Sequence, residues 1–227
     1  MAFSFLWYDL ETFGLHPQWE PIDLFCKTSP DYLPDPEACI VTGLTPVTVA
    51  ESGLRERDFA ARIYEEMITP GTCTAGYNTI RFDDEFVRAL FYRNFFDPYK
   101  REYEHGNARW DLLDLVRMCH DLRPEGIEWV VGEEGRPSFK LEMLAEANGI
   151  DTGHAHSAID DVRTTVALAR LLSEKQPRLF KYFFGLRRKV EVRRRLNLQQ
   201  MKPVLHTSRM FTSEHGCTTV VLPLSVH

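Results

Sequence analysis

The sequence lacks the features of secreted, membrane-spanning and zinc-binding proteins. Its five cysteines are scattered, odd in number and never in a C-x-x-C spacing, which argues against a disulfide framework and a zinc site. No basic segment precedes the first apolar run, as a signal peptide would require, and no run approaches the length of a membrane span. These absences predict a cytoplasmic protein with reduced thiols and no membrane contact, and we expect a monomer.

The sequence also has fewer basic than acidic residues. The chain has 27 Lys and Arg against 33 Asp and Glu, a formal net charge of −6, whereas a nucleic-acid partner would usually call for a basic surface. A net charge says little about local patches, and acids gathered around bound metal would lower it. With 227 residues, 44% of them hydrophobic, the chain is long enough for one well-buried domain and part of a second.

Two carboxylates stand at the end of the first apolar run. The stretch FSFLWYDLETFG, residues 3–14, is almost wholly apolar until Asp9 and Glu11, and it then turns at Gly14. In a strand, residues i and i+2 point to the same face, so these two acids would project together. Like charges beside a hydrophobic layer are costly unless a cation lies between them. The pair indicates either a metal site or the solvated end of a strand.

Two further acidic sites follow. In GYNTIRFDDE a strand and a turn deliver Asp83 and Asp84 to the start of a helix. In HAHSAIDDV, His156 stands five residues before Asp161. Acids in the first turn of a helix also stabilise it through its dipole, so each site taken alone has a purely structural explanation.

The three sites together predict a chemistry. Carboxylates from separate elements are able to hold two Mg²⁺ or Mn²⁺ ions, which clamp the attacking and leaving oxygens of an in-line phosphoryl displacement. A neighbouring histidine is able to take the proton from the attacking water. The ordered set D-x-E, D and H-x4-D therefore indicates hydrolysis of a phosphodiester.

The pattern of strands and helices predicts an α/β domain over residues 1 to about 175. The expected strands are residues 3–9, 22–26 and 72–78, and the expected helices are residues 54–67, 83–94, 110–122, 138–149, 156–176 and 178–189. Ser138 is the expected N-cap of its helix, and Gly149 follows the end of that helix. Prolines and glycines make residues 28–53 loop-rich, and β-branched runs after Arg195 predict the opening of a β-rich unit.

Longer motifs point to a family. They are DLETFGLHP, DYLP, TGLTP, GYNTIRFDDE, FYRNFFDPY, RWDLLDL, LRPEGI, PSFKLE, ANGI, QPRLF and QMKP, and they span nearly the whole chain. The chain resembles the DEDDh 3′–5′ exonucleases of the RNase H-like superfamily, and within them the bacterial exodeoxyribonuclease I family. This implies an α/β, RNase H-like exonuclease domain (a mixed sheet flanked by helices) over residues 1–176. A helical basic connector over 177–200 and the truncated start of a β-rich SH3-like domain over 201–227 would follow.

The resemblance also implies the residues of the site. The catalytic set would be Asp9, Glu11, Asp83, His156 and Asp161. Within it, the metal ligands would be Asp9, Glu11 and Asp161, with Asp83 completing the acidic cluster. His156 would be the general base. The family's register selects Asp83 over Asp84, and it likewise selects Asp161 over Asp160.

The implied activity is 3′ to 5′ degradation of single-stranded DNA to 5′-mononucleotides, with a role in DNA repair and recombination. The implied cofactors are two Mg²⁺ ions, with Mn²⁺ as a substitute, and the implied partners are single-stranded DNA and single-stranded DNA-binding protein. Two alternatives stay open. One is an exonuclease acting on short RNA, because the contact to the 2′ position is not visible in the sequence. The other is an inactive single-strand-binding fragment, although a pure binder gains nothing from clustered carboxylates.

Basic and aromatic residues interleave over residues 86–103, where the basic residues are Arg88, Arg93, Lys100 and Arg101. Bases that stack on rings gain about 1–3 kcal/mol each. We favour a core position for Phe91 and Phe95, and contact with bases for Tyr99 and Tyr103. The resemblance implies nucleic-acid contacts at Arg88, Tyr99, Arg117 and Lys140, to which we add Glu11 and Tyr103. The eight basic residues of 178–195 form either a phosphate-binding patch or a solvated helix face.

The chain departs from the family at two places. After ETFGLHP the family runs through a further strand and turn, so this chain lacks on the order of 15–20 residues there. Loss of a strand beside Asp9 and Glu11 would weaken the sheet that positions them, unless the numbering runs across a missing segment. The family also continues into the rest of its SH3-like barrel and a helical region, so processivity and grip on a single strand are in question.

Overall fold

The structure is a computed structural model that describes residues 4–9, 12–13, 22–29, 31, 34–132, 135–153, 158–211 and 217–224. The chain divides into two units, residues 1–109 with 152–163 and residues 110–151 with 164–227. Two elements, β4 (Ala108–Asp111) and α7 (Ala158–Lys175), begin in the first unit and end in the second. The described residues of the predicted catalytic set, Asp9, Asp83 and Asp161, belong to the first unit.

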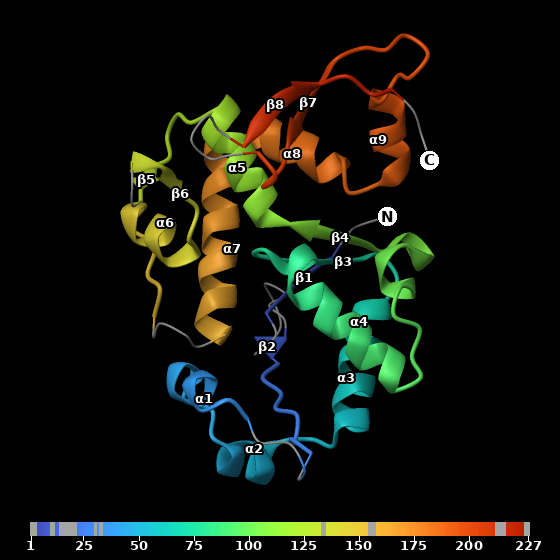
Figure 1. The fold of residues 1–227 in the computed structure, drawn as a ribbon, viewed down its shortest axis with the longest axis vertical. Coiled ribbons are helices and arrows are strands. Elements are labelled where there is room, and N and C mark those ends of the chain that lie inside the picture. The colour runs from blue at the N-terminus through green and yellow to red at the C-terminus, as the bar shows by residue number, and fades with distance from the viewer. Residues whose placement is uncertain are drawn as a thin grey trace. The chain divides into compact units, whose positions relative to one another are not determined.

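The first unit is built on a mixed sheet. Its strands are β1 (Ser4–Asp9), β2 (Thr12–Phe13), β3 (Thr72–Gly76) and the start of β4, in the order β2-β1-β3-β4. Strands β1 and β3 lie side by side in parallel (Figure 1), whereas β2 pairs with β1 in antiparallel fashion. The other elements are the helices α1 (Pro36–Thr42), α2 (Pro46–Ser52), α3 (Glu56–Ile68) and α4 (Asp83–Arg93), and the 3₁₀ turns η1 (Thr79–Arg81), η2 (Lys100–Glu102) and η3 (Glu104–Gly106). The predicted fold class is confirmed.

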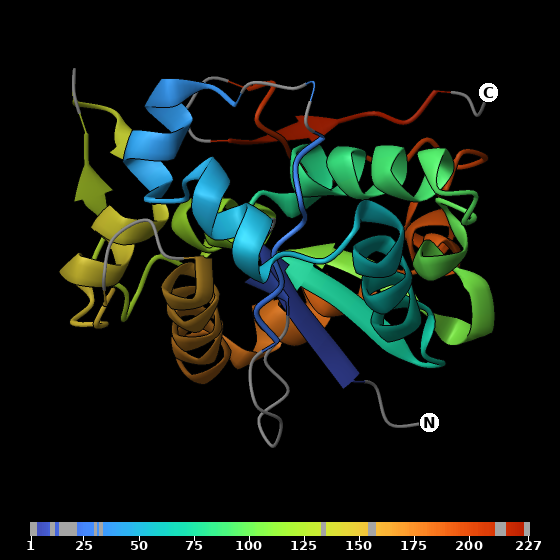
Figure 2. The same ribbon diagram turned by 90° about the horizontal axis from the view of Figure 1, so that it is seen from below.

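One cluster of apolar side chains holds β1, α3 and α4 together. Ile63 and Met67 stand at i and i+4 on α3, and Val87 and Phe91 repeat that spacing on α4, so each pair forms a stripe on one face of its helix. Tyr8 of β1 lies in the same cluster. Figure 2 shows α3 and α4 next to the β1–β3 pair. Full burial of such a side chain contributes about 1.5–3 kcal/mol, so this cluster fixes α4 against the sheet.

The second unit contains the end of β4 and most of α7, together with α5 (Leu112–Leu122), β5 (Val130–Val131), β6 (Pro137–Ser138), α6 (Leu141–Ala147), α8 (Pro177–Gly185), α9 (Lys189–Arg195), β7 (Val204–Thr207) and β8 (Thr218–Val221). Trp110 packs against three rings of α8, those of Phe180, Phe183 and Phe184. Strands β7 and β8 form a separate antiparallel pair. No helix in the described ranges is long and apolar enough to cross a membrane.

The prediction of a loop-rich passage over residues 28–53 is wrong, because this passage contains α1 and α2. Each helix begins with proline at its first position, preceded by a capping residue. Asp35 accepts a hydrogen bond from the amide of Glu37, and Thr45 accepts one from the amide of Thr48. Proline lacks only an amide proton that would be unpaired at a helix start, so Asp-Pro and Thr-Pro here begin helices.

Three further predictions need correction. Residues 22–26 form no strand, because the pairing here is limited to single bridges such as Cys26 with Leu54. Ser138 lies in β6, and Lys140 occupies the N-cap of α6. Phe95 is 98% exposed, since α4 ends at Arg93 before Phe95 is able to join the buried face. The expected position of Gly149 just after α6 is confirmed by its φ of +70°.

Candidate active site

Asp9 lies at the carboxyl end of β1 and is partly buried. The neighbouring strand β3 ends at Gly76, where a Cβ atom would lie 2.7 Å from the carbonyl oxygen of Tyr8. Only glycine permits this close approach, which brings the ends of β1 and β3 together. Glu11 lies outside the described residues, so its pairing with Asp9 stays a prediction.

Asp83 and Asp84 occupy the first turn of α4, and both are buried, with 3% and 1% of their surface exposed. The carboxylate of Asp84 is engaged by cations and a hydroxyl of the protein itself. Its Oδ1 accepts hydrogen bonds from the Tyr8 hydroxyl at 2.5 Å and from Nη2 of Arg101 at 2.6 Å. Its Oδ2 accepts one from Nη1 of Arg109 at 2.9 Å. Asp84 therefore has a structural role.

Two more charged residues extend this network. Glu102 lies 3.3 Å from Nε of Arg109 and 2.8 Å from Nη2 of Arg88. Arg101 is fully buried, and its Nη1 also donates to the Thr74 hydroxyl of β3 at 3.4 Å. The sequence placed Arg101 among the basic residues interleaved with aromatics, but its complete burial makes it part of the core. Neither the partners nor the burial of Arg101 has a local sequence signal, because Asp84 lies 17 positions away.

Burial and neighbouring charges shift the pKa values of both Asp84 and Tyr8. Burial raises the pKa of the Asp84 carboxyl, but the charge of Arg101 and the hydrogen bonds from Tyr8, Arg101 and Arg109 outweigh it, so the pKa lies below its ordinary value. Burial also raises the pKa of the Tyr8 phenol, and the negative charge of Asp84 adds to that effect. Asp84 is thus held ionised and Tyr8 is held as a neutral donor.

The third acidic site lies in the first turn of α7, where Asp160 and Asp161 are adjacent. Asp160 forms an ion pair with Arg163 at 3.1 Å. A Cβ atom at Gly153, whose φ is +62°, would lie 2.8 Å from the carboxyl carbon of Asp160, so the loop before α7 lies close to this acid. His156 lies outside the described residues.

The described residues alone do not form the predicted metal site. Within these ranges, no three His, Cys, Asp or Glu side chains form a group able to hold a metal ion. Glu11 and His156 fall outside the ranges, so this finding does not include them. The donors that are described, Asp9, Asp83 and Asp161, are carboxylates at the ends of separate elements of one unit, and carboxylate oxygens suit hard divalent cations.

The predicted nucleic-acid contacts lie in both units. Tyr99 and Tyr103 of the first unit are exposed, and the guanidinium of Arg88 lies 5.4 Å from the centre of the Tyr99 ring. Lys140 is exposed just before α6 in the second unit. Arg117, also in the second unit, is largely buried and pairs with Asp114 at 3.0 Å.

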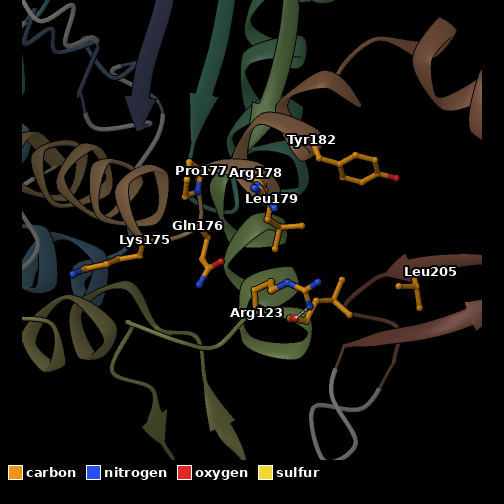
Figure 3. A pocket seen from close by; sticks show the side chains of 9 residues that line it. Arg123, Lys175, Gln176, Pro177, Arg178, Leu179, Tyr182 and Leu205 are labelled. Atoms are coloured by element: carbon orange, nitrogen blue, oxygen red, sulfur yellow. Dashed lines mark hydrogen bonds between the residues drawn. The ribbon is translucent and has the colours of Figure 1, made fainter.

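A pocket of about 560 Å³ in the second unit was not predicted from the sequence (Figure 3). It lies among the ends of α5 and α7, the start of α8 and β7. Its lining combines cationic and apolar side chains, among them Arg123, Lys175, Arg178, Tyr182 and Leu205. The motifs LRPEGI and QPRLF supply several of these residues, but only the fold brings the two segments together.

A family model described as "Exonuclease" matches residues 19–169, more than half of the chain. The chain belongs to this exonuclease family. A second model, the "Exonuclease I SH3-like domain", matches residues 187–227. The family predicted from the sequence is thereby confirmed, and its members depend on a divalent metal ion.

Among individual proteins, the chain is 47% identical to exodeoxyribonuclease I of Haemophilus influenzae and 45% identical to that of Escherichia coli K12. Each alignment covers 99% of this chain, and 52% and 51% of the respective relatives, so the chain spans about half their length. The Haemophilus alignment has 244 positions against 227 residues here, so at least 17 positions face a gap in this chain. The size of this difference is similar to the roughly 15–20 residues expected to be missing, and their place after Pro17 stays a prediction.

Solved structures of relatives are similar to this chain in fold as well as in sequence. The structure of E. coli exonuclease I with a dA16 oligonucleotide has a TM-score of 0.93 at 45% identity, covering 100% of this chain and 52% of that one. A zinc-bound complex of E. coli ExoI with single-stranded DNA has a TM-score of 0.90 at 45% identity, covering 99% and 52%. An ExoI/SSB-Ct complex has a TM-score of 0.92 at 44% identity, covering 100% and 53%.

The raised pKa of Tyr8 leads to a pH-dependent stability. An unfolded tyrosine loses its proton near pH 10, so the stabilisation from the protonated, buried phenol is fully present below about pH 10. It is lost as the pH rises from there toward the higher folded-state pKa. We expect the urea midpoint of the wild type to fall more steeply above about pH 10 than that of Tyr8→Phe. Equal slopes in the two proteins would contradict this assignment.

Proposed function

We propose that this chain is an exodeoxyribonuclease that degrades single-stranded DNA in the 3′ to 5′ direction and releases 5′-mononucleotides. The observation that carries the proposal is the identity of 47% and 45% to two proteins named exodeoxyribonuclease I over 99% of the chain. The acidic residues Asp9, Asp83 and Asp161, which lie in one unit at the ends of separate elements, support it. By the same relationship, we propose a role in DNA repair and recombination.

Asp9, Glu11 and Asp161 would hold two Mg²⁺ ions, or Mn²⁺ in their place, and Asp83 would complete the acidic cluster. When bound, such ions stabilise the negative charge that develops on the phosphate and on the leaving 3′ oxygen. His156 takes a proton from the water that attacks the terminal phosphodiester. The new P–O bond forms as the bond to the 3′ oxygen breaks, so the terminal nucleotide leaves with a 5′-phosphate and the remaining strand ends in a 3′-hydroxyl.

Asp83 and Asp84 divide two tasks in this proposal. Both Asp84 oxygens accept hydrogen bonds from Tyr8, Arg101 and Arg109, so Asp84 acts in the core, and we assign its neighbour Asp83 to the metal site. The division agrees with the family's register. At α7, Asp160 pairs with Arg163, and the family's register selects Asp161 as the ligand.

The first prediction from this proposal concerns turnover. With Mg²⁺ and a 5′-labelled single-stranded DNA, we expect progressive shortening from the 3′ end, lost on chelation. Asp161→Ala should lose more than about a hundredfold in rate, since even residues that only orient metal ligands cost about 10–100-fold. Asp160→Ala is the matched control and should stay within a few-fold of the wild type. Labelled products resolved on a denaturing gel measure both rates.

Two results would overturn this proposal. A folded protein that binds the DNA but never shortens it would be an inactive binding fragment. Faster shortening of an RNA strand of matched sequence would change the substrate class.

The second prediction concerns the exposed ring of Tyr99, which Arg88 helps to hold through its guanidinium. If a base stacks on this ring, Tyr99→Ala should weaken binding of single-stranded DNA by about 1–3 kcal/mol. Tyr92→Ala is the control, because Tyr92 is also exposed but is not an implied contact. Fluorescence anisotropy with a labelled oligonucleotide and a chelator measures both affinities. An equal effect of the two substitutions would argue against a specific stacking role for Tyr99.

We also propose single-stranded DNA-binding protein as a partner, since a solved relative is an ExoI/SSB-Ct complex. The pocket in Figure 3 suits the carboxylate end of a chain, because Arg123 and Arg178 supply positive charge beside apolar Leu179 and Leu205. Arg123→Ala should weaken binding of a labelled peptide with the C-terminal sequence of single-stranded DNA-binding protein roughly tenfold. Arg170→Ala, on the exposed side of α7, should not. Equal affinities of all three proteins would remove the pocket from this role.

The remaining expectations are proposals of the same kind. We propose a cytoplasmic location, which the five free cysteines support, and a monomeric chain. We retain the division into an exonuclease domain over residues 1–176, a basic connector over 177–200 and the start of an SH3-like domain over 201–227. Cell fractionation and sedimentation of the purified chain test the first two proposals.

A further inference from the structure

The network around Asp84 joins the two elements that carry Asp9 and Asp83. Tyr8 immediately precedes Asp9 at the end of β1, and Asp84 immediately follows Asp83 at the start of α4. The hydrogen bond from the Tyr8 hydroxyl to Asp84 Oδ1 is 2.5 Å long and connects residues 76 positions apart. One bond therefore links the two segments directly.

The geometry of strand and helix keeps this bond apart from the predicted acidic cluster. Successive residues of a strand point to opposite faces, so Tyr8 enters the core shared with α3 and α4, and Asp9 points to the other face. Successive residues of a helix are turned by about 100°, so Asp84 is able to bond to Tyr8 while Asp83 faces elsewhere. Each bonded residue is thus adjacent in the chain to a predicted metal-site residue without occupying the site.

The acceptor end of the bond is itself fixed from several directions. Arg101 of η2 binds Oδ1 of Asp84, and Arg109 of β4 binds Oδ2. Arg101 also donates to Thr74 of β3, the register partner of Leu6 in β1. Because Asp84 and Arg101 are buried, any shift of α4 along the sheet would leave a charge without its partner, at a large cost in free energy.

We propose that Tyr8 is a positioning residue whose hydroxyl sets the place of Asp9 relative to Asp83. The proposal rests on the metal-dependent function proposed above and assigns Tyr8 no contact with metal or DNA. A metal site needs its ligands within about 0.5 Å of the productive geometry. Without the hydroxyl, the end of β1 and the start of α4 keep their apolar packing but lose the bond that fixes their separation.

Tyr8→Phe tests this role, with Tyr64→Phe as the matched control. Tyr64 stacks on Phe96 and meets Phe91 edge-on, so it packs against the same core. The control therefore also removes one tyrosine hydroxyl beside the same core. Titration calorimetry measures Mn²⁺ binding to each protein without DNA. Tyr8→Phe should bind Mn²⁺ at least about tenfold more weakly, as found when groups that orient metal ligands are removed. Tyr64→Phe should stay within about twofold of the wild type.

Two further measurements separate positioning from stability. In turnover assays, Tyr8→Phe should need about tenfold more Mn²⁺ for half-maximal rate, with most of the rate restored at saturation. Amide hydrogen exchange should be faster in Tyr8→Phe at Leu6–Asp9 and at Asp83–Phe86 together, and unchanged there in Tyr64→Phe. A purely structural role would lower the thermal midpoint of Tyr8→Phe without these differences.

Wild-type Mn²⁺ affinity in Tyr8→Phe would overturn the positioning role. If the wild type itself neither binds Mn²⁺ nor shortens DNA, the proposed function fails instead. In that case the hydrogen exchange decides: faster exchange at both segments in Tyr8→Phe alone supports the link, and equal exchange in the two variants overturns it.

Discussion

The ion pair between Asp84 and Arg101 is the constraint on which the first unit depends. Two charges with 1% and 0% exposure lose their hydration on folding, at a cost of several kcal/mol per ion. That cost is offset only if each charge finds well-placed partners. Tyr8, Thr74 and Arg109 supply them from three strands, so the sheet, the η2 turn and the start of α4 have to meet in one arrangement. The ion pair therefore fixes the arrangement of these elements more than it adds to the free energy of unfolding.

This constraint explains how adjacent acids acquire different roles. At the start of α4, Asp84 pairs with the buried Arg101 and the partly buried Arg109, and at the start of α7, Asp160 pairs with Arg163. In both places the acid selected by the family's register, Asp83 or Asp161, is the neighbour of the acid paired with arginine. Helix geometry turns neighbouring side chains apart, so one turn is able to serve the core and a metal site together.

The same network accounts for part of the basic and aromatic interleaving over residues 86–103. Arg101 is buried against Asp84, and Arg88 is paired with Glu102. These cations neutralise acids of the same unit, so their pairing leaves the net charge of −6 unchanged, and they do not count as free basic groups for a nucleic acid. Tyr99 keeps its exposed ring beside Arg88, so a stacking surface and an internal ion pair share one guanidinium.

The sequence alone determined the family, the mixed α/β fold and the long elements, because apolar periodicity and extended motifs are local properties. It predicted α3 through Ile63 and Met67, and the end of α6 through Gly149. It did not reveal α1 and α2, whose prolines read as loops until Asp35 and Thr45 are seen to cap them. Only the tertiary structure decided that Phe95 is exposed, that Arg101 is buried and that Tyr8 bonds to Asp84. The last two outcomes depend on contacts between segments 17 and 76 residues apart, which no local pattern records.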